Sequence, residues 1–373
     1  MIQVNEPLLN GNEKKYLNEC IDTGWISSEG PFVKQFEERM ALSAGRKHGI
    51  AVCNGSVALD LAVQALGIGV GDEVILPSFT IISCAAAIVR AGAIPVFIDA
   101  DATTWNIDTN LIEQALTPRT KAIMVVHIYG LPCDMDKVSA IAKKHNLYII
   151  EDAAEMHGQT YNGKPCGGFG DVSTFSFYPN KHVTTGEGGM VLCNNDAIAD
   201  KCRSMRNLCF IPERRFKHEE LGYNFRMTNL QAALGMAQAE RLDEFIVKKR
   251  TIGKLYDELL SSLKNIVQLP LTTTPYADNI YWVYAMVVND NIPLNAQQCM
   301  DELLKLGIGT RPFFYPMHQQ PVFKKASWYT PQHLAVSERI AEKGFYIPSG
   351  LAITTAQQEQ VAEAVHKLFS TYK

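Results

Sequence analysis

One lysine, Lys181, lies in a short turn between two stretches of residues that favour β-strands. The aromatic run at residues 174–178 precedes the turn, and the glycine-rich run at residues 184–189 follows it. An amine held near apolar groups loses proton affinity and becomes a usable nucleophile. Most lysines, however, are solvated surface residues. The turn alone therefore leaves a catalytic amine and a surface lysine both open.

A second candidate consists of Asn54, Gly55 and Ser56, which follow a predicted strand at residues 48–53 and precede a predicted helix at residues 57–66. The N-terminus of a helix offers free backbone N–H groups and the positive end of the helix dipole, so it suits a phosphate group. Asparagine and serine are also ordinary helix caps. The tripeptide is therefore either a phosphate cradle or a plain cap.

A third candidate, Asp152, follows an apolar predicted strand at residues 148–151. Parallel sheets bind ligands beyond the carboxyl ends of their strands, so Asp152 lies where a ligand would bind; the alternative is that it only caps the following turn. Taken together, Lys181, Asp152 and the helix N-terminus are the three groups that a pyridoxal 5′-phosphate (PLP) site requires. In such a site the lysine forms a Schiff base, the carboxylate pairs with the pyridine nitrogen, and the helix holds the phosphate.

The elements that must position these residues form an alternating pattern. We expect strands at residues 48–53, 73–76, 94–98, 122–126, 148–151, 172–177 and 189–193. We expect helices at residues 57–66, 82–91, 111–116, 135–145, 196–206 and 229–259. The alternation predicts an α/β fold with a central, mostly parallel sheet that is covered on both faces.

The last third of the chain has a different pattern. It combines a short predicted strand at residues 281–288 with helices at 295–306 and 356–369, and residues 307–320 form an irregular loop with two prolines. This mixture predicts a smaller α+β C-terminal domain. We therefore expect a large domain at residues 1–250, which includes the N-terminal segment, and a small domain at residues 251–373.

The composition excludes several classes of protein. The chain has 373 residues and a formal net charge of −4, so it has no excess of basic residues for binding nucleic acid. Its nine cysteines form no Cys-x-x-Cys pair, which argues against a zinc site or a disulfide framework. The longest apolar stretch, at residues 74–89, is too short to span a bilayer. We expect a soluble, cytoplasmic protein without a metal.

The sequence is similar to the sugar aminotransferases of the DegT/DnrJ/StrS family. The resemblance implies the fold-type I architecture of PLP-dependent enzymes, an aminotransferase activity and a role in making sugars of the O-antigen (lipopolysaccharide) kind. Ordered motifs carry it at residues 24–31, 54–56, 151–155, 175–181, 186–189 and 222–228.

The resemblance implies a role for each matching residue. Lys181 would bind the cofactor covalently and move a proton during the reaction. Asp152 would bind the pyridine nitrogen, with Glu155 close to the ring. The phosphate would be bound by Gly55, Ser56 and Ser176, and by Asn224 from the neighbouring subunit of a homodimer.

Two further positions bear on the reaction. Related sugar 3-dehydratases carry a histidine in place of the reactive lysine, but here Lys181 occupies that position and His182 follows it, which favours transamination. Many family members have an aromatic residue that stacks on the cofactor ring, where this chain has Ile81. Either Ile81 packs on the ring, or Phe79 does part of that work.

The segment at residues 310–318 resembles the substrate loop of family members that transfer an amine from L-glutamate to C4 of GDP-4-keto-6-deoxymannose. Its side chains suit a nucleotide-linked sugar through charge-assisted and neutral hydrogen bonds; the alternative is that they are rim residues of the small domain. Two N-terminal residues line the sugar pocket on the same analogy. The implied substrate-binding residues are Trp25, Ser28, Arg311, Tyr315 and His318.

Other functions stay open at this point. The nearest is a C4 or C3 aminotransferase that acts on a UDP- or dTDP-linked keto-sugar, because it would share the scaffold and the cofactor. A PLP-binding regulator without turnover would be expected to have a broken site. A nucleotide-sugar-binding module does not explain the lysine turn.

Overall fold

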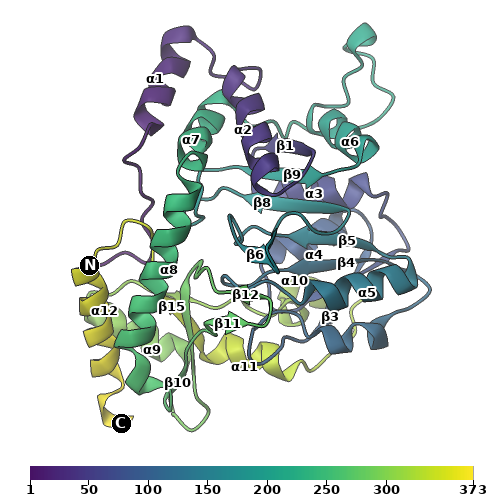
Figure 1. Cartoon of the computed structure of the whole chain (residues 1–373). Helices are drawn as coiled ribbons and strands as arrows, with labels where there is room; N and C mark the ends of the chain where they lie inside the picture. The colour runs from purple at the N-terminus through teal and green to yellow at the C-terminus, as the bar shows by residue number, and fades with distance from the viewer. Residues whose placement is uncertain (373) are drawn as a thin grey trace.

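The computed structural model describes residues 1–372 and has a seven-stranded sheet at its centre (Figure 1). Its strands are β1 (His48–Val52), β2 (Glu73–Pro77), β3 (Ile94–Ile98), β4 (Thr120–Val126), β5 (Tyr148–Asp152), β8 (Val172–Ser176) and β9 (Gly189–Cys193). The strand order is β1-β9-β8-β5-β4-β2-β3. Strand β9 is antiparallel to both neighbours, whereas the pairs from β8 to β3 are parallel. The prediction of a mostly parallel sheet is confirmed.

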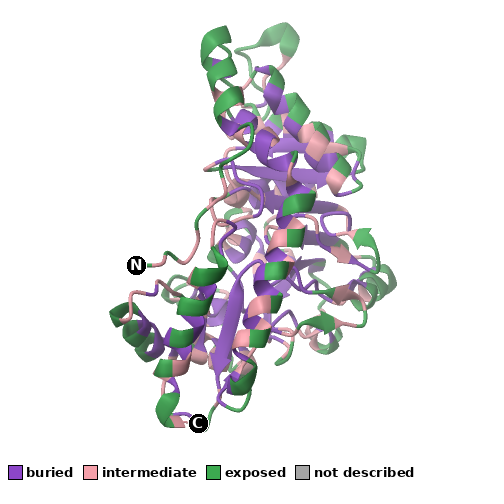
Figure 2. Ribbon diagram, turned by 60° about the vertical axis from the view of Figure 1, so that its left-hand side comes forward, coloured by how far each residue is buried: buried purple, intermediate pink, exposed green. Residues whose placement is uncertain are grey.

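Both faces of this sheet are buried, as the apolar strand sequences predict. Every residue of β2 and of β9 is buried, without the alternation that a half-exposed strand would show. Figure 2 shows the buried strands between helices whose outer faces are exposed. The architecture is that of an α/β protein with two helical layers.

Helices α3, α4 and α6 contribute to the core on one face of the sheet, and α2, α5 and α7 contribute to the core on the other. Helix α1 packs against α7. The bounds are α1 (Glu13–Thr23), α2 (Pro31–Ser43), α3 (Gly55–Ala65), α4 (Ile82–Arg90), α5 (Met135–His145), α6 (Asp196–Arg206) and α7 (Asn229–Ala239). Short 3₁₀ turns lie at Thr109–Leu111, Glu113–Ala115 and Pro212–Arg214.

The C-terminal part contains a four-stranded antiparallel sheet of order β10-β13-β15-β14. Its strands are β10 (Val267–Gln268), β13 (Tyr284–Val288), β14 (Arg311–Pro312) and β15 (Gly344–Ile347). Its helices are α8 (Leu242–Leu259), α9 (Ala296–Lys305), α10 (Pro321–Lys324), α11 (Ala335–Lys343) and α12 (Thr355–Leu368), with 3₁₀ turns at Ser261–Leu263, Met317–Gln319 and Ser370–Tyr372. Two short ribbons pair β6 (Thr160–Tyr161) with β7 (Lys164–Pro165) and β11 (Thr273–Thr274) with β12 (Ala277–Asp278).

Two predicted helices differ from the structure. Residues 111–116 form only 3₁₀ turns, because fewer than two helical turns fit there and a helix nucleus is costly to form. The predicted helix at residues 229–259 is two helices, α7 and α8, separated at Glu240 and Arg241. At this break Glu240 accepts a hydrogen bond of 2.6 Å from the Tyr16 hydroxyl, which links α1 to the junction of α7 and α8.

The part of the chain that contains the seven-stranded sheet (the large part) and the C-terminal part (the small part) are joined at several places. Residues of the small part, among them Phe313 and Ile340, belong to the same hydrophobic core as strands of the large sheet. The first residues of the chain also lie against the small part, where Ile2 pairs with Ile308 and the N–H of Ser349 donates to Val4 (Figure 1). The division at residue 250 stays a prediction. Within residues 1–372, no helix is both long and apolar enough to cross a membrane.

Helix α8 connects the two parts and carries a buried lysine, Lys249, which is 2% exposed. Its Nζ donates to the backbone carbonyl groups of Trp282 (3.0 Å) and Ser349 (2.5 Å). Burial lowers the pKa of Lys249 to about 7. A neutral amine has two hydrogens, which matches the two carbonyl acceptors.

This burial predicts a pH-dependent stability. The unfolded chain keeps Lys249 protonated up to its ordinary pKa, so between pH 7 and pH 10 the unfolded state binds more protons and stability rises with pH. Lys249→Met removes this contribution. We expect the stability difference between wild type and variant to grow by about 2 kcal/mol in favour of wild type from pH 7 to pH 9. Urea unfolding at fixed protein concentration measures this difference, and Lys254→Met on the exposed side of α8 is the control. Equal slopes with pH in both proteins would contradict the buried neutral amine.

Candidate active site

A cavity of about 410 Å³ opens where β4, β5 and β8 end. Parallel strands end at one edge of a sheet, so residues that are far apart in the sequence meet there. His127, Asp152 and Ser176 line the cavity from these strand ends, and Lys181 lines it from the turn after β8. The predicted cofactor residues Gly55, Ser56 and Glu155 line it as well.

Lys181 is a buried amine, and its side chain is 10% exposed. Its Nζ lies 3.8 Å from Oε1 of Glu155 and 4.0 Å from the centre of the Trp282 ring. Burial lowers the pKa of Lys181, and the neighbouring carboxylates Glu155 and Asp152 oppose that change. The amine of Lys181 therefore loses its proton more readily than that of a surface lysine. The two carboxylates still stabilise its cationic form.

Asp152 ends β5 and is held by two neutral donors. Its Oδ1 accepts from the N–H of Ala154 (3.0 Å), and its Oδ2 accepts from the thiol of Cys84 (3.2 Å). Burial raises the pKa of Asp152, although both hydrogen bonds and the Lys181 charge favour its ionised form. The carboxylate faces the cavity without an ion pair of its own, so it suits a ligand that brings a positive group.

Glu155 is fixed through the backbone of Tyr129, whose N–H donates to Oε2 over 2.7 Å. Tyr129 holds this position with φ at +54°, in the left-handed region that a bulky residue rarely adopts. Burial raises the pKa of Glu155, and the charge of Lys181 opposes the rise. The carboxyl group can therefore exchange a proton with its surroundings near neutral pH.

The N-terminus of α3 forms the other end of the cavity. Asn54 caps the helix by accepting from the N–H of Val57 (3.0 Å), and Gly55 is the first helical residue. A Cβ at Gly55 would lie 2.8 Å from Cβ of Ser176, so only glycine allows this close approach. Ser56 exchanges a hydrogen bond of 2.7 Å with Ser83. Backbone N–H groups and hydroxyls thus converge on a site that suits an anion.

Several predicted residues do not line the cavity of this chain. Asn224 is exposed and pairs with Asn207, so any contact with a cofactor would have to be made in another subunit. His318 is buried, and its ring nitrogens bind Ser78 Oγ (2.7 Å) and Glu338 Oε1 (2.9 Å), which gives it a structural connection instead of a free ligand group. The other four substrate-binding predictions lie on the surface or half-buried, away from the lining: Trp25, Ser28, Arg311 and Tyr315.

The sequence left open which residue faces a bound ring, Ile81 or Phe79, and it placed His182 next to the reactive lysine. Ile81 lines the cavity and is 44% exposed, whereas Phe79 is buried among Tyr129, Phe313 and Phe314. The geometry therefore favours Ile81 as the residue that faces a bound ring. His182 does not line the cavity, and burial lowers its pKa to about 3.

An aromatic wall was not predicted. Trp282, Phe314 and Tyr346 line the cavity from the small part of the chain. Trp282 and Tyr346 lie in short apolar stretches, and nothing in the local sequence separates them from core residues. Phe314 lies in the loop at residues 310–318 that was predicted to bind substrate, and that loop was a signal that could have identified it. Asn180 also lines the cavity, and its position next to the lysine was a signal that could have identified it.

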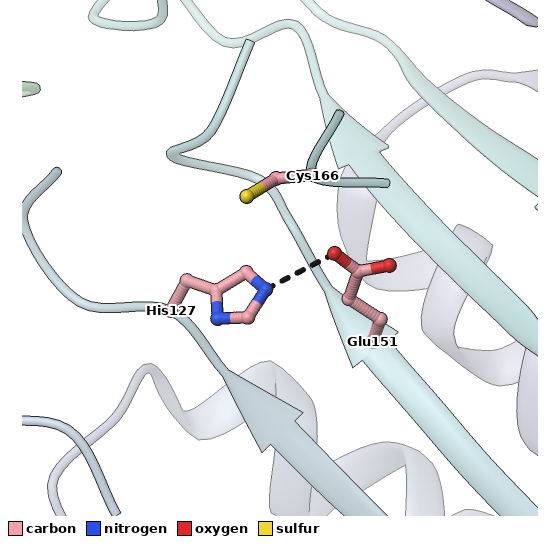
Figure 3. Close-up of side chains that lie close together, drawn as sticks. All are labelled: His127, Glu151 and Cys166. Atoms are coloured by element: carbon pink, nitrogen blue, oxygen red, sulfur yellow. Dashed lines mark hydrogen bonds and ion pairs between the residues drawn. The ribbon is translucent and has the colours of Figure 1, made fainter. Parts of the chain in front are cut away.

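Beneath the cavity, His127, Glu151 and Cys166 lie close together in the core, and Figure 3 shows the imidazole and the carboxylate facing one another. Nδ1 of His127 accepts from the N–H of Cys133 (3.0 Å), so Nε2 carries the proton and donates to Glu151 (3.0 Å). Glu151 also accepts from two backbone N–H groups of the loop before β8. The imidazole of His127 and the carboxylate of Glu151 are satisfied by one another and by backbone N–H groups.

Comparison with known proteins places the whole chain in one family. The model of the DegT/DnrJ/EryC1/StrS aminotransferase family matches residues 7–366. The chain is 42% identical to the GDP-perosamine synthase of Caulobacter vibrioides, over 98% of each chain. It is 40% identical to the GDP-perosamine synthase of Vibrio cholerae, over 99% of this chain and 100% of that protein. The chain therefore belongs to the DegT/DnrJ/EryC1/StrS aminotransferase family, and the predicted enzyme class is confirmed.

Solved structures agree with the fold. The aminotransferase TlmJ of Streptoalloteichus hindustanus superposes on this chain with a TM-score of 0.92 at 28% identity, and the superposition covers 100% of each chain. DesV of S. venezuelae, solved in complex with a ketimine intermediate, superposes with a TM-score of 0.88 at 31% identity, over 95% of this chain and 94% of that one. The predicted aspartate-aminotransferase-like architecture is confirmed.

The cluster under the cavity generates a stability prediction. Glu151→Gln keeps the volume but replaces one acceptor oxygen by an N–H₂ group that faces a backbone donor, so we expect a loss of about 3 kcal/mol in the free energy of unfolding. Urea denaturation measures the loss, with exposed Glu363→Gln as the matched control. Chelation by EDTA should leave the wild-type midpoint unchanged. A lower midpoint in EDTA would show that the cluster holds a metal instead.

Proposed function

We propose that the protein is a PLP-dependent aminotransferase that moves the amino group of L-glutamate to C4 of GDP-4-keto-6-deoxy-D-mannose, giving GDP-perosamine. The observation that carries this proposal is the full-length identity of 40–42% to three GDP-perosamine synthases. It coincides with a cavity in which the lysine, both carboxylates and the helix N-terminus are present together. Similarity over the full length includes the small part, which contributes one wall of the cavity.

The residues present fit PLP. Two buried polar atoms at the cavity, Thr174 Oγ1 and Asn180 Oδ1, have no hydrogen-bond partner among residues 1–372. Asp152 is a buried carboxylate that a protonated pyridine nitrogen would satisfy. Gly55, Ser56 and Ser176 would hold the phosphate at the start of α3. Ile81 offers an apolar face for the ring.

When bound, PLP supplies an electron sink that stabilises negative charge at the carbon undergoing proton transfer. Asp152 would pair with the pyridine nitrogen and so support this sink. Nζ of Lys181 would hold the cofactor covalently. As a free amine, Nζ of Lys181 would act as the base that takes and returns a proton. Glu155, 3.8 Å from Nζ, stabilises the ammonium form after the proton arrives.

The proposed contact between Asn224 and the phosphate needs a second subunit. Asn224 lies on the surface in one chain, as a residue that completes the neighbouring site would. We therefore propose a homodimer in which Asn224 reaches the phosphate of the partner site. Trp25, Ser28, Arg311 and Tyr315 are proposed to contact the nucleotide-sugar, and His318 is proposed only to hold the loop that carries Arg311 and Tyr315. All nine cysteines are free thiols, which fits a cytoplasmic enzyme.

Two alternatives have specific support. The dTDP-3-amino-3,6-dideoxy-alpha-D-galactopyranose transaminase of Aneurinibacillus thermoaerophilus is 35% identical over 94% of this chain and 93% of that protein, so a dTDP-linked substrate aminated at C3 is the second candidate. A UDP-linked sugar is the third candidate substrate, as the sequence left open. A "pleiotropic regulatory protein" of Geobacillus stearothermophilus is 38% identical over 98% of this chain and 99% of that protein. The complete set of Lys181, Asp152 and Glu155 favours turnover over a purely regulatory role.

The first test removes the reactive amine. Lys181→Ala should lose the visible absorbance of the bound cofactor and at least about 10²–10⁴-fold of the turnover, because no other lysine among residues 1–372 lines the cavity and could carry the proton. Absorbance spectra and steady-state rates measure both effects. Lys143→Ala, on the exposed side of α5, is the control. Normal turnover in Lys181→Ala would end this proposal.

The second test identifies the substrate. Purified protein is incubated with L-glutamate and, separately, the GDP-, UDP- and dTDP-linked 4-keto-6-deoxy sugars, and the products are identified by mass spectrometry and NMR. We expect amination at C4 of the GDP-linked sugar. A product aminated at C3, or formed only from a UDP- or dTDP-linked sugar, would replace the GDP-perosamine proposal by one of the alternatives.

A further inference from the structure

Two residues that are distant in the sequence donate hydrogen bonds to the backbone of the turn that carries Lys181. Nδ2 of Asn5 donates to the carbonyl of Pro179 (3.0 Å), and Nε1 of Trp282 donates to the carbonyl of Asn180 (2.9 Å). These carbonyls belong to the two residues directly before Lys181. The backbone position of the reactive amine is therefore set by an N-terminal residue and by a residue of the small part.

Trp282 contacts Lys181 in a second way. Its ring centre lies 4.0 Å from Nζ, and the ring stacks on Tyr129 at a centroid distance of 5.8 Å. A ring at this distance stabilises a cation through its π face and also keeps water away from the amine. The indole thus contacts both the side chain of Lys181 and the backbone that precedes it.

Lys249 holds both of these segments. Its Nζ donates to the carbonyl of Trp282 itself and to the carbonyl of Ser349. The N–H of Ser349 donates to Val4 (3.2 Å), which is next to Asn5. A water-sized cavity separates Lys249 from the turn and is also lined by Asn5, Lys181 and His182, whose Nε2 has no partner among residues 1–372. Methionine has a similar length but no N–H group, so the substitution removes the two hydrogen bonds of Lys249.

We propose that Lys249 is a positioning residue: by binding the carbonyls of Trp282 and Ser349, it fixes the indole against Lys181 and Asn5 against the Lys181 turn. The proposal rests on the proposed function in that Lys181 is the reactive amine. It goes further, because it assigns the placement of that amine to a side chain on α8 that touches neither the large cavity nor any substrate. A lysine that served stability alone would leave the Lys181 amine unchanged when removed.

The test measures the Lys181 amine directly, in full-length protein from which the cofactor has been removed. Trace acetic anhydride labels the amine at a series of pH values, and peptide mass spectrometry quantifies labelling of Lys181. The titratable groups that act on this amine are Glu155, Asp152 and Cys84. His157 and His182 also lie close enough to interact with its charge, and the substitutions alter none of these five groups. In Lys249→Met we expect the labelling midpoint to move up by about one pH unit, because a looser turn admits water and desolvation is the main cause that lowers the Lys181 pKa.

Two further variants separate positioning from a general loss of structure. Asn5 is half-buried, and Asn5→Ala removes its hydrogen bond to the carbonyl of Pro179. This variant should move the midpoint in the same direction, even if Lys249→Met folds poorly. In a Trp282→Phe background, Lys249→Met should shift the midpoint by less than half of its effect in wild type, because the two residues act in series. Lys254→Met is the matched control and should not move it. A midpoint in folded Lys249→Met and in Asn5→Ala that equals that of wild type would overturn the proposal.

Turnover of the GDP-linked sugar by wild type is measured alongside. If wild type turns over no nucleotide-sugar, the proposed function fails whatever the labelling shows. If wild type is active and the midpoints do not move, the positioning role of Lys249 fails alone. We expect Lys249→Met to lower kcat about tenfold or more with a smaller change in KM, since it alters the amine and leaves the substrate contacts in place.

Discussion

The structure depends on keeping one amine buried beside two buried carboxylates at the carboxyl edge of a parallel sheet. Burial alone would neutralise Lys181, and the carboxylates alone would hold it as a cation; together they leave the amine able to exist in both forms. Asp152 and Glu155 differ in their partners, because neutral donors hold Asp152 whereas Glu155 faces the amine directly. Burial raises the pKa of both carboxyl groups, and the charge of Lys181 opposes the rise in each.

The site is assembled from the whole chain. The large sheet supplies the carboxylates, the N-terminus of α3 lines the cavity, and the small part supplies an aromatic wall. Asn5, near the start of the chain, donates a hydrogen bond to the lysine turn. Because the large and small parts share one hydrophobic core, the wall and the sheet edge are held together by packing instead of by a single hinge contact. A substitution far from the cavity, such as one on α8, can therefore act on the chemistry.

The sequence predicted what is local and missed what is assembled at a distance. The strands and the residues that end them follow from apolar runs and turn residues, and Asp152, Lys181 and the start of α3 line one cavity. Their roles toward a cofactor stay predictions. Trp282 could not be identified, since its contact with Lys181 spans a hundred residues and its local pattern is that of a core strand. His318 was placed in the sugar pocket by its type, but Ser78 and Glu338 occupy both of its ring nitrogens.

In the proposed reaction an amino group passes from L-glutamate to the keto-sugar at this cavity. The fate of the nitrogen can be followed directly: the enzyme is supplied with ¹⁵N-labelled L-glutamate and GDP-4-keto-6-deoxymannose, and the product is examined by ¹⁵N-edited NMR. We expect a ¹⁵N atom bonded to C4 of the sugar. A sugar product without the label, or with the label on another carbon, would contradict it.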